Sequence, residues 1–183
     1  MSAPIDPHAF EKCLSQLLSR LAPEATLHGA VSTSTGFVAG TRIATPMGYV
    51  AVERLAVGDP VLTSYGRVAC IDAVGVSLVT VTPETALVRI ETGTLGNISP
   101  LRLGQGHRIS LSNWNGENLR GSDAVLTNAL SLVNGQNVTL EVPTEPVEFV
   151  QLMFERPNIV LAENVPCETL CIGEDRIAQR DAA

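Results

Sequence analysis

The side chains of this chain that could do chemistry are few and widely spaced. The cysteines and histidines are Cys13, Cys70, Cys167, Cys171, His8, His28 and His107. A metal site needs several such ligands close together, and the one close pair, Cys167 and Cys171, has no histidine near it in the sequence. We therefore predict no bound metal and no cofactor, and interpret the cysteines as reduced, mostly buried thiols.

Other catalytic patterns are absent from the sequence. It contains no Ser-His-Asp arrangement, no HExxH, no P-loop and no dinucleotide-binding fingerprint. Asp59 follows Gly58 in a turn, where its carboxylate is expected to accept backbone N–H groups. A role for Asp59 as a general base is the alternative. His107 has the same two interpretations, a polarising group or an ordinary strand histidine satisfied by one hydrogen bond.

The elements that would position these residues are short β-strands. After Gly36 the chain is a succession of short runs rich in Val, Ile, Leu and Thr, such as RVACIDAVG and VEFVQLMF, separated by turn signals such as Ser64-Tyr65-Gly66. The connections are too short for βαβ crossovers. The sequence therefore predicts an all-β domain of ten to fourteen short, mostly antiparallel strands.

One amphipathic helix is expected before that domain. Asp6 is a suitable N-cap and Pro7 suits the first helical position. An apolar stripe over residues 7–21 follows at three- and four-residue spacing, and Pro23 ends it. The stripe must be buried against the domain or against another chain, so a protein partner or a homo-oligomer is expected to dock there.

Charge and hydropathy exclude some classes of partner. The formal net charge is −7 and the pI is about 4.9, which disfavours nucleic acid and anionic membranes, because both bind clustered Lys and Arg. No apolar run is long enough to span a membrane, and no signal peptide is visible. A cytoplasmic location, or a place in a larger particle or assembly, is expected.

Five strings, in order, carry a family resemblance. They are GTRIATPMG at 40–48, VERLAVGDPVLTSYG at 52–66, LVRIETGTLGN at 87–97, LVNG at 132–135 and FERPNIVLAENVPCETL at 154–170. With the His-Arg-Ile at 107–109, they resemble bacterial Hint (Hedgehog/intein-type) autoprocessing domains. The resemblance implies a horseshoe-like all-β fold in which the first residue lies centrally, beside a strand that carries a histidine.

The resemblance also implies a chemistry. In the family the first residue is normally Cys or Ser, and its side chain attacks the carbonyl of the preceding residue through a five-membered ring. A histidine donates to the departing amide nitrogen. Here the aligned first residue is Gly36, which has no nucleophile, and His107 remains. Ser34 and Thr35 are nearby hydroxyls, but each would attack its own preceding carbonyl.

Other positions depart from the family pattern as well. Gly104 stands where Thr or Ser is expected, Gly106 where Asp is common, and Pro157 where His is common. Asn134-Gly135 is in the middle of the domain, so it predicts a hairpin turn, whereas a splicing asparagine would stand at the end. Framework residues are kept while the residues of the chemistry are replaced.

Two hypotheses follow. In the first, the chain is a catalytically degenerate Hint-like domain that acts as a structural or protein-interaction module and is not an enzyme. Residues 1–35 would form the helix and a polar linker, residues 36–172 the β-domain, and residues 173–183 a tail. In the second, the domain cleaves itself near residues 33–36 through Ser34 or Thr35. A third, weaker hypothesis is that only the nucleophile is lost, in which case Gly36→Cys would restore thiol-induced cleavage. Because the Thr near His107 is also missing, we expect little or no such cleavage.

Overall fold

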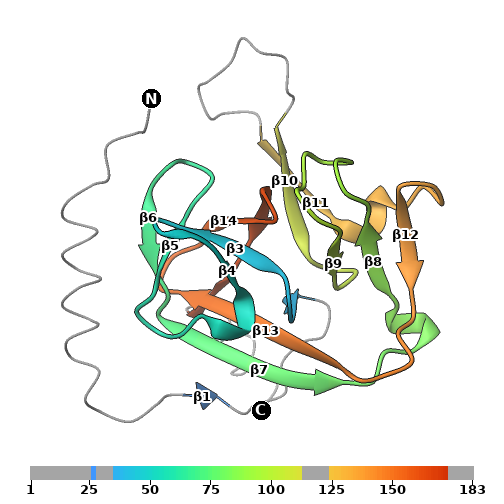
Figure 1. Ribbon diagram of the computed structural model, residues 1–183, viewed down its shortest axis with the longest axis horizontal. Helices are drawn as coiled ribbons and strands as arrows, with labels where there is room; N and C mark the ends of the chain where they lie inside the picture. Colours follow the sequence, from blue (N-terminus) through green and yellow to red (C-terminus); the bar gives the residue numbers. More distant parts are fainter. Residues whose placement is uncertain (1–25, 28–34, 113–123, 173–183) are drawn as a thin grey trace, which may run out of the picture.

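The computed structural model describes residues 26–27, 35–112 and 124–172 (Figure 1). Within these ranges the chain forms strands, turns and three short 3-10 helices, the longest of four residues. The prediction of an all-β, mostly antiparallel fold is confirmed. The helix expected at 7–21, Ser34 and the tail 173–183 lie outside the described residues.

The larger sheet has eight strands, and its longest pair is β7 with β13. Along the main path the order is β1-β7-β13-β2-β9-β8-β12, with β16 paired to β13. Two pairings, β1 with β7 and β13 with β16, are parallel. Figure 1 shows β7 (green) and β13 (orange) running side by side. The strands are β1 (Thr26–Leu27), β2 (Phe37–Val38), β7 (Ala73–Val79), β8 (Leu87–Ile90), β9 (Leu101–Leu103), β12 (Val138–Glu141), β13 (Val147–Phe154) and β16 (Leu170–Cys171).

A six-stranded sheet and a two-stranded ribbon complete the domain. The six-stranded order is β11-β10-β15-β14-β3-β4, and β5 pairs with β6. These strands are β3 (Arg42–Thr45), β4 (Gly48–Ala51), β5 (Pro60–Leu62), β6 (Val68–Cys70), β10 (Arg108–Ser112), β11 (Ala124–Asn128), β14 (Ile159–Ala162) and β15 (Val165–Glu168). The 3-10 helices are η1 (Val52–Arg54), η2 (Pro83–Thr85) and η3 (Ala129–Leu132).

A large apolar core joins the sheets, beside a smaller separate cluster. It is built mainly from Val, Ile, Leu and Phe side chains, of which Phe37, Phe154 and Ile43 are among the largest fully buried ones. Burying side chains of this size contributes about 1.5–3 kcal/mol each. Phe37 belongs to β2, so the core fixes the strand that follows Gly36.

The strings that carry the family resemblance form the framework of the fold. Thr45 Oγ1 donates to the carbonyl of Gly48 at 2.6 Å and closes the turn between β3 and β4. The Glu53 carboxylate accepts the N–H of Gly40 at 2.8 Å, and that of Asp59 accepts the N–H of Ala56 at 2.8 Å. The turn role expected for Asp59 is confirmed.

The cysteines differ from expectation in part. Cys167 and Cys171 are free and buried, as expected, but Cys70 is disulfide-bonded, so the prediction of a reduced thiol is wrong at this position. Disulfide pairing depends on tertiary contacts that spacing along the chain does not reveal. Cys13 lies outside the described residues.

The loop at Asn134 also differs from expectation. It connects η3 to β12 instead of joining two strands. The Asn134 side-chain oxygen accepts the N–H groups of Gln136, Asn137 and Val138. The turn residues were recognised, but the prediction of a hairpin is wrong, because a 3-10 helix occupies the segment before the turn.

The part of the chain that the structure describes contains no helix with the length and apolar character needed to cross a membrane.

Candidate functional site

The junction between Thr35 and Gly36 lies at the middle of the larger sheet. Gly36 directly precedes β2, which is held between β13 and β9. The register pairs Phe37 with Val150 of β13 and with Leu103 of β9. Gly36 is buried and Thr35 is half-buried. The pairing on both sides of β2 leaves the peptide unit that enters the strand little freedom to move.

His107 is brought to this junction by a tight turn between β9 and β10. Its N–H donates to the carbonyl of Gly104 at 3.1 Å, and its carbonyl accepts the N–H of Ala129 at 2.8 Å. Both backbone groups of His107 are therefore held, which fixes the point from which its side chain projects. Gly104 thus has a backbone role at the position where Thr or Ser was expected.

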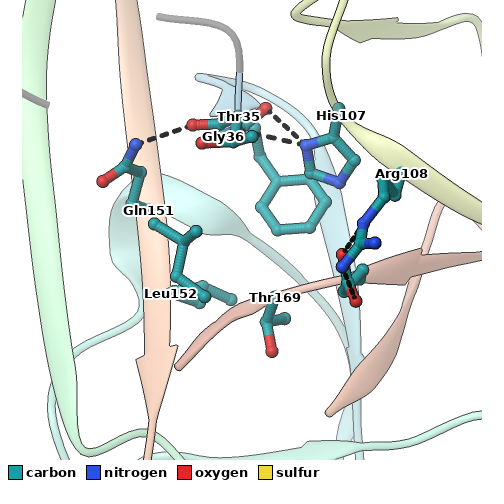
Figure 2. A pocket seen from close by; sticks show the side chains of 10 residues that line it. Thr35, Gly36, His107, Arg108, Gln151, Leu152 and Thr169 are labelled. Carbon is teal, nitrogen blue, oxygen red and sulfur yellow. Dashed lines mark hydrogen bonds and ion pairs between the residues drawn. The ribbon is translucent and has the colours of Figure 1, made fainter. Parts of the chain in front are cut away.

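The imidazole of His107 faces the backbone of Gly36. Its Nδ1 lies 3.1 Å from the nitrogen of Gly36 and 3.1 Å from its carbonyl oxygen (Figure 2). The structure therefore brings together the two residues that the sequence placed at the nucleophile and polarising positions. They lie 71 residues apart in the chain.

His107 is a neutral side chain at pH 7. It is 3 % exposed, and burial lowers its pKa from 6.5 to about 4, although the hydrogen bond to Gly36 acts in the opposite direction. Its ring packs on Phe37 with 4.8 Å between the ring centroids. The Nε2 atom has no hydrogen-bond partner among the described residues. A neutral ring can accept the Gly36 N–H through Nδ1, with its own proton on Nε2.

Gln151 of β13 binds the other end of the same peptide unit. Its Nε2 donates to the carbonyl oxygen of Thr35 at 2.7 Å (Figure 2). The sequence analysis missed this residue. The available signal was a polar residue flanked on both sides by apolar ones in VEFVQLMF, because a buried amide requires a hydrogen-bond partner.

A small pocket adjoins the junction. It has a volume of about 30 Å³, enough for a water molecule. Beyond the junction itself, its lining includes Arg108, Glu168 and Thr169. The guanidinium of Arg108 pairs with the carboxylate of Glu168, and Thr169 Oγ1 donates to the carbonyl of Asn158 at 3.0 Å.

The backbone at Gly36 suits glycine. Its φ is +150°, a value that L side chains rarely adopt. A Cβ built there would lie 3.3 Å from Cγ of Gln151 and 3.4 Å from Cδ1 of Phe149. A side chain at residue 36 would therefore be strained in its backbone and would press against Gln151 and Phe149.

The remaining candidates lie away from the junction. Cys167 and Cys171 are not among the residues that line the pocket, and burial raises the pKa of the Cys167 thiol well above its ordinary value. No three His, Cys, Asp or Glu side chains in the described ranges are grouped to hold a metal ion. Pro157 lies just before β14, on the exposed surface.

Comparison with known proteins gives a family. The sequence model described as the Hint domain matches residues 35–174. A search of curated proteins found no match.

A search of solved structures found matches at low identity, among them three inteins or intein-like domains. The bacterial intein-like domain from Clostridium thermocellum is 20 % identical with a TM-score of 0.49, over 74 % of this chain and 98 % of that one. The MchDnaB-1 intein is 19 % identical with a TM-score of 0.47, over 72 % and 98 %. The AceL NrdHF class 3 split intein is 14 % identical with a TM-score of 0.49, over 74 % and 97 %.

Proposed function

This chain belongs to the Hint domain family, and we propose that it is a catalytically degenerate member that serves as a structural or protein-interaction module. The observation that carries the proposal is the state of the Thr35–Gly36 peptide unit. His107 contacts its nitrogen side and Gln151 contacts its oxygen, yet Gly36 supplies no atom to attack it.

Self-cleavage of a Hint domain begins with an intramolecular attack. A sulfur or oxygen on residue 36 would bond to the carbonyl carbon of Thr35, the C–N bond to residue 36 would break, and the nitrogen would take up a proton. With no side chain at residue 36, the first bond cannot form. His107 and Gln151 can still orient the peptide unit, but orientation does not replace a nucleophile.

Water is a poor substitute at this site. A water molecule in the pocket needs a base to activate it. His107 faces the backbone of Gly36 through Nδ1, and Glu168 is paired with Arg108. Both groups are already occupied in the described structure, so hydrolysis of the junction has no evident base to drive it.

The second candidate function, self-cleavage through Ser34 or Thr35, draws support from the contact between His107 and Gly36. The geometry weighs against it, however. The hydroxyl of Thr35 could attack only the carbonyl of Ser34, whereas His107 and Gln151 hold the next peptide unit. His107 and Gln151 therefore contact the Thr35–Gly36 peptide bond, whereas the Thr35 hydroxyl could attack only the Ser34–Thr35 peptide bond.

Intact mass spectrometry tests the proposal. The purified chain is incubated for days at neutral pH, alone and with a thiol or hydroxylamine. The proposal expects one species near 19.4 kDa throughout. Fragments separated near residues 33–36 would overturn it, and a Ser34→Ala, Thr35→Ala double variant that still cleaved would show that neither hydroxyl is the nucleophile.

The interaction role is supported by apolar side chains on terminal strands of the two sheets. On β11, Val125 is 60 % exposed and its sequence neighbour Leu126 is 38 % exposed, and on β12 Leu140 is 49 % exposed. Exposed edge strands of this kind invite pairing with another chain. We propose that a protein partner or a second copy binds this module here or through residues 7–21, within the cytoplasm or a larger assembly.

Light scattering of the full chain tests the interaction role. The proposal expects a stable oligomer, or a complex with a co-purifying protein. If β11 is the binding site, Val125→Lys and Leu126→Lys should weaken that complex. If residues 7–21 are the binding site, their deletion should weaken it. A strictly monomeric chain that retains no partner would contradict it.

A further inference from the structure

The side chain of Gln151 is unusual for its place in the fold. It is 4 % exposed and lies between the fully buried Val150 and Leu152, on a strand whose other residues are apolar except for Glu148. Burying an amide costs free energy unless hydrogen bonds replace its contacts with water. Its 2.7 Å bond to the carbonyl of Thr35 is one such replacement.

The same side chain limits what residue 36 can be. Its Cγ lies 3.3 Å from the position that a Cβ on residue 36 would take. Contacts this close require the neighbour to shift. The aliphatic part of Gln151 therefore lies against the missing side chain, while its amide holds the preceding carbonyl.

His107 completes the arrangement from the opposite side. Its Nδ1 contacts the nitrogen of Gly36, and Gln151 contacts the oxygen of Thr35, so both polar atoms of one peptide unit are bound by buried side chains (Figure 2). Each side chain comes from a different part of the chain, β13 or the turn before β10.

We propose that Gln151 is a positioning residue which, with His107, forms a latch on the Thr35–Gly36 peptide unit. The latch fixes the point where the N-terminal segment enters the β-domain. This inference rests on the proposed function, in which the junction stays intact. Gln151 bonds to the carbonyl that a nucleophile would attack, so the latch holds this peptide unit in place although Gly36 supplies no nucleophile.

Gln151→Met tests the latch. Methionine has a similar length and packs well but cannot donate a hydrogen bond. Losing one hydrogen bond costs about 1 kcal/mol, so exchange of the Gly36 amide hydrogen should become roughly fivefold faster. The carbonyl carbon of Thr35 should also shift upfield in the NMR spectrum, since a hydrogen bond deshields it.

Ser77→Ala is the matched control. Ser77 is on β7, next to β13, and its hydroxyl is buried without a partner among the described residues. Its removal should leave the exchange of Gly36 and the Thr35 resonance unchanged. If Gln151→Met leaves both unchanged too, or accelerates Gly36 no more than the amide of Ile109 in the other sheet, the latch is refuted.

A measurement on the unaltered chain covers the case in which Gln151→Met does not fold. The side-chain NH2 of Gln151 should exchange at least tenfold more slowly than that of the exposed Gln136. Equal rates would refute the latch. The intact mass of the same sample tests the proposed function separately. Cleavage at the junction would refute the proposed function, whereas the hydrogen-exchange rates test only the latch.

Discussion

Acid should destabilise this protein through His107. Burial lowers the pKa of the folded-state imidazole from 6.5 to about 4. Between these two values the unfolded chain binds a proton that the folded chain does not. The stability linked to His107 is therefore fully present above about pH 6.5 and is lost as the pH falls towards 4.

The size of the effect follows from the two pKa values. Lowering the pH from 7 to 5 should cost about 2 kcal/mol of unfolding free energy through His107 alone. Carboxylates also contribute as the pH falls, so the change must be compared with that of a variant. His107→Gln removes the titrating group and keeps a polar side chain of similar size.

Urea unfolding of both proteins at several pH values between 7 and 5 measures the difference. With a slope of about 2 kcal/mol per M, the urea midpoint of the unaltered chain should fall by roughly 1 M more than that of His107→Gln. Parallel pH profiles would refute the reasoning, as would an NMR titration that places the pKa of His107 near 6.5.

Four further predictions concern single residues. Gly36→Cys should lower the unfolding free energy by about 1–3 kcal/mol, because a side chain is strained at φ +150°, and intact mass should show no thiol-induced cleavage. Glu163→Ala should cost about 2 kcal/mol in urea unfolding, because the buried carboxylate accepts three N–H groups of Arg42; an unchanged midpoint would contradict that. Asn97→Ala should cost about 2–3 kcal/mol by the same assay, since the 2 % exposed amide bonds to several loop backbone groups, and a loss below 0.5 kcal/mol would count against this. Cys167 should resist a thiol reagent until the chain unfolds, because it is fully buried and its pKa is raised; peptide mapping that finds it labelled in the native chain would show otherwise.

Much of the fold could be predicted because its signals are local. Runs such as RVACIDAVG supplied β6 and β7, and the turn at Ser64-Tyr65-Gly66 lies between β5 and β6 as expected. The strand β9 was missed because its three residues include the charged Arg102 and stand outside any longer apolar run, whereas the three-residue β6 lies within RVACIDAVG. The pairing with β2 and β8 defines β9 instead.

The candidate site was predictable only in part. Gly36 and His107 were found because the family resemblance aligns them, and the structure places them in contact. Gln151 could not be assigned in the same way. Its role depends on the register between β13 and the residues before β2, and register is a long-range property.

The ion pair between the buried Glu163 and the partly exposed Arg42 shows the same limit. The two residues are 121 positions apart, and their contact is made by the pairing of β14 with β3. Glu163 has a φ of +47° in the turn between β14 and β15, where Asn or Gly is more usual. Its side-chain bonds to Arg42 stabilise a conformation that local preference alone would not select.

The most direct test of the central claim is a peptide map of the chain as it accumulates in the cells that produce it. Digestion with a protease that spares the junction, followed by mass spectrometry, reports whether Thr35 and Gly36 are still joined. The account predicts one continuous peptide across the junction, with no chains that begin at Gly36. A substantial population of chains beginning at Gly36 would contradict it, because it would show that the fold still breaks the bond it holds.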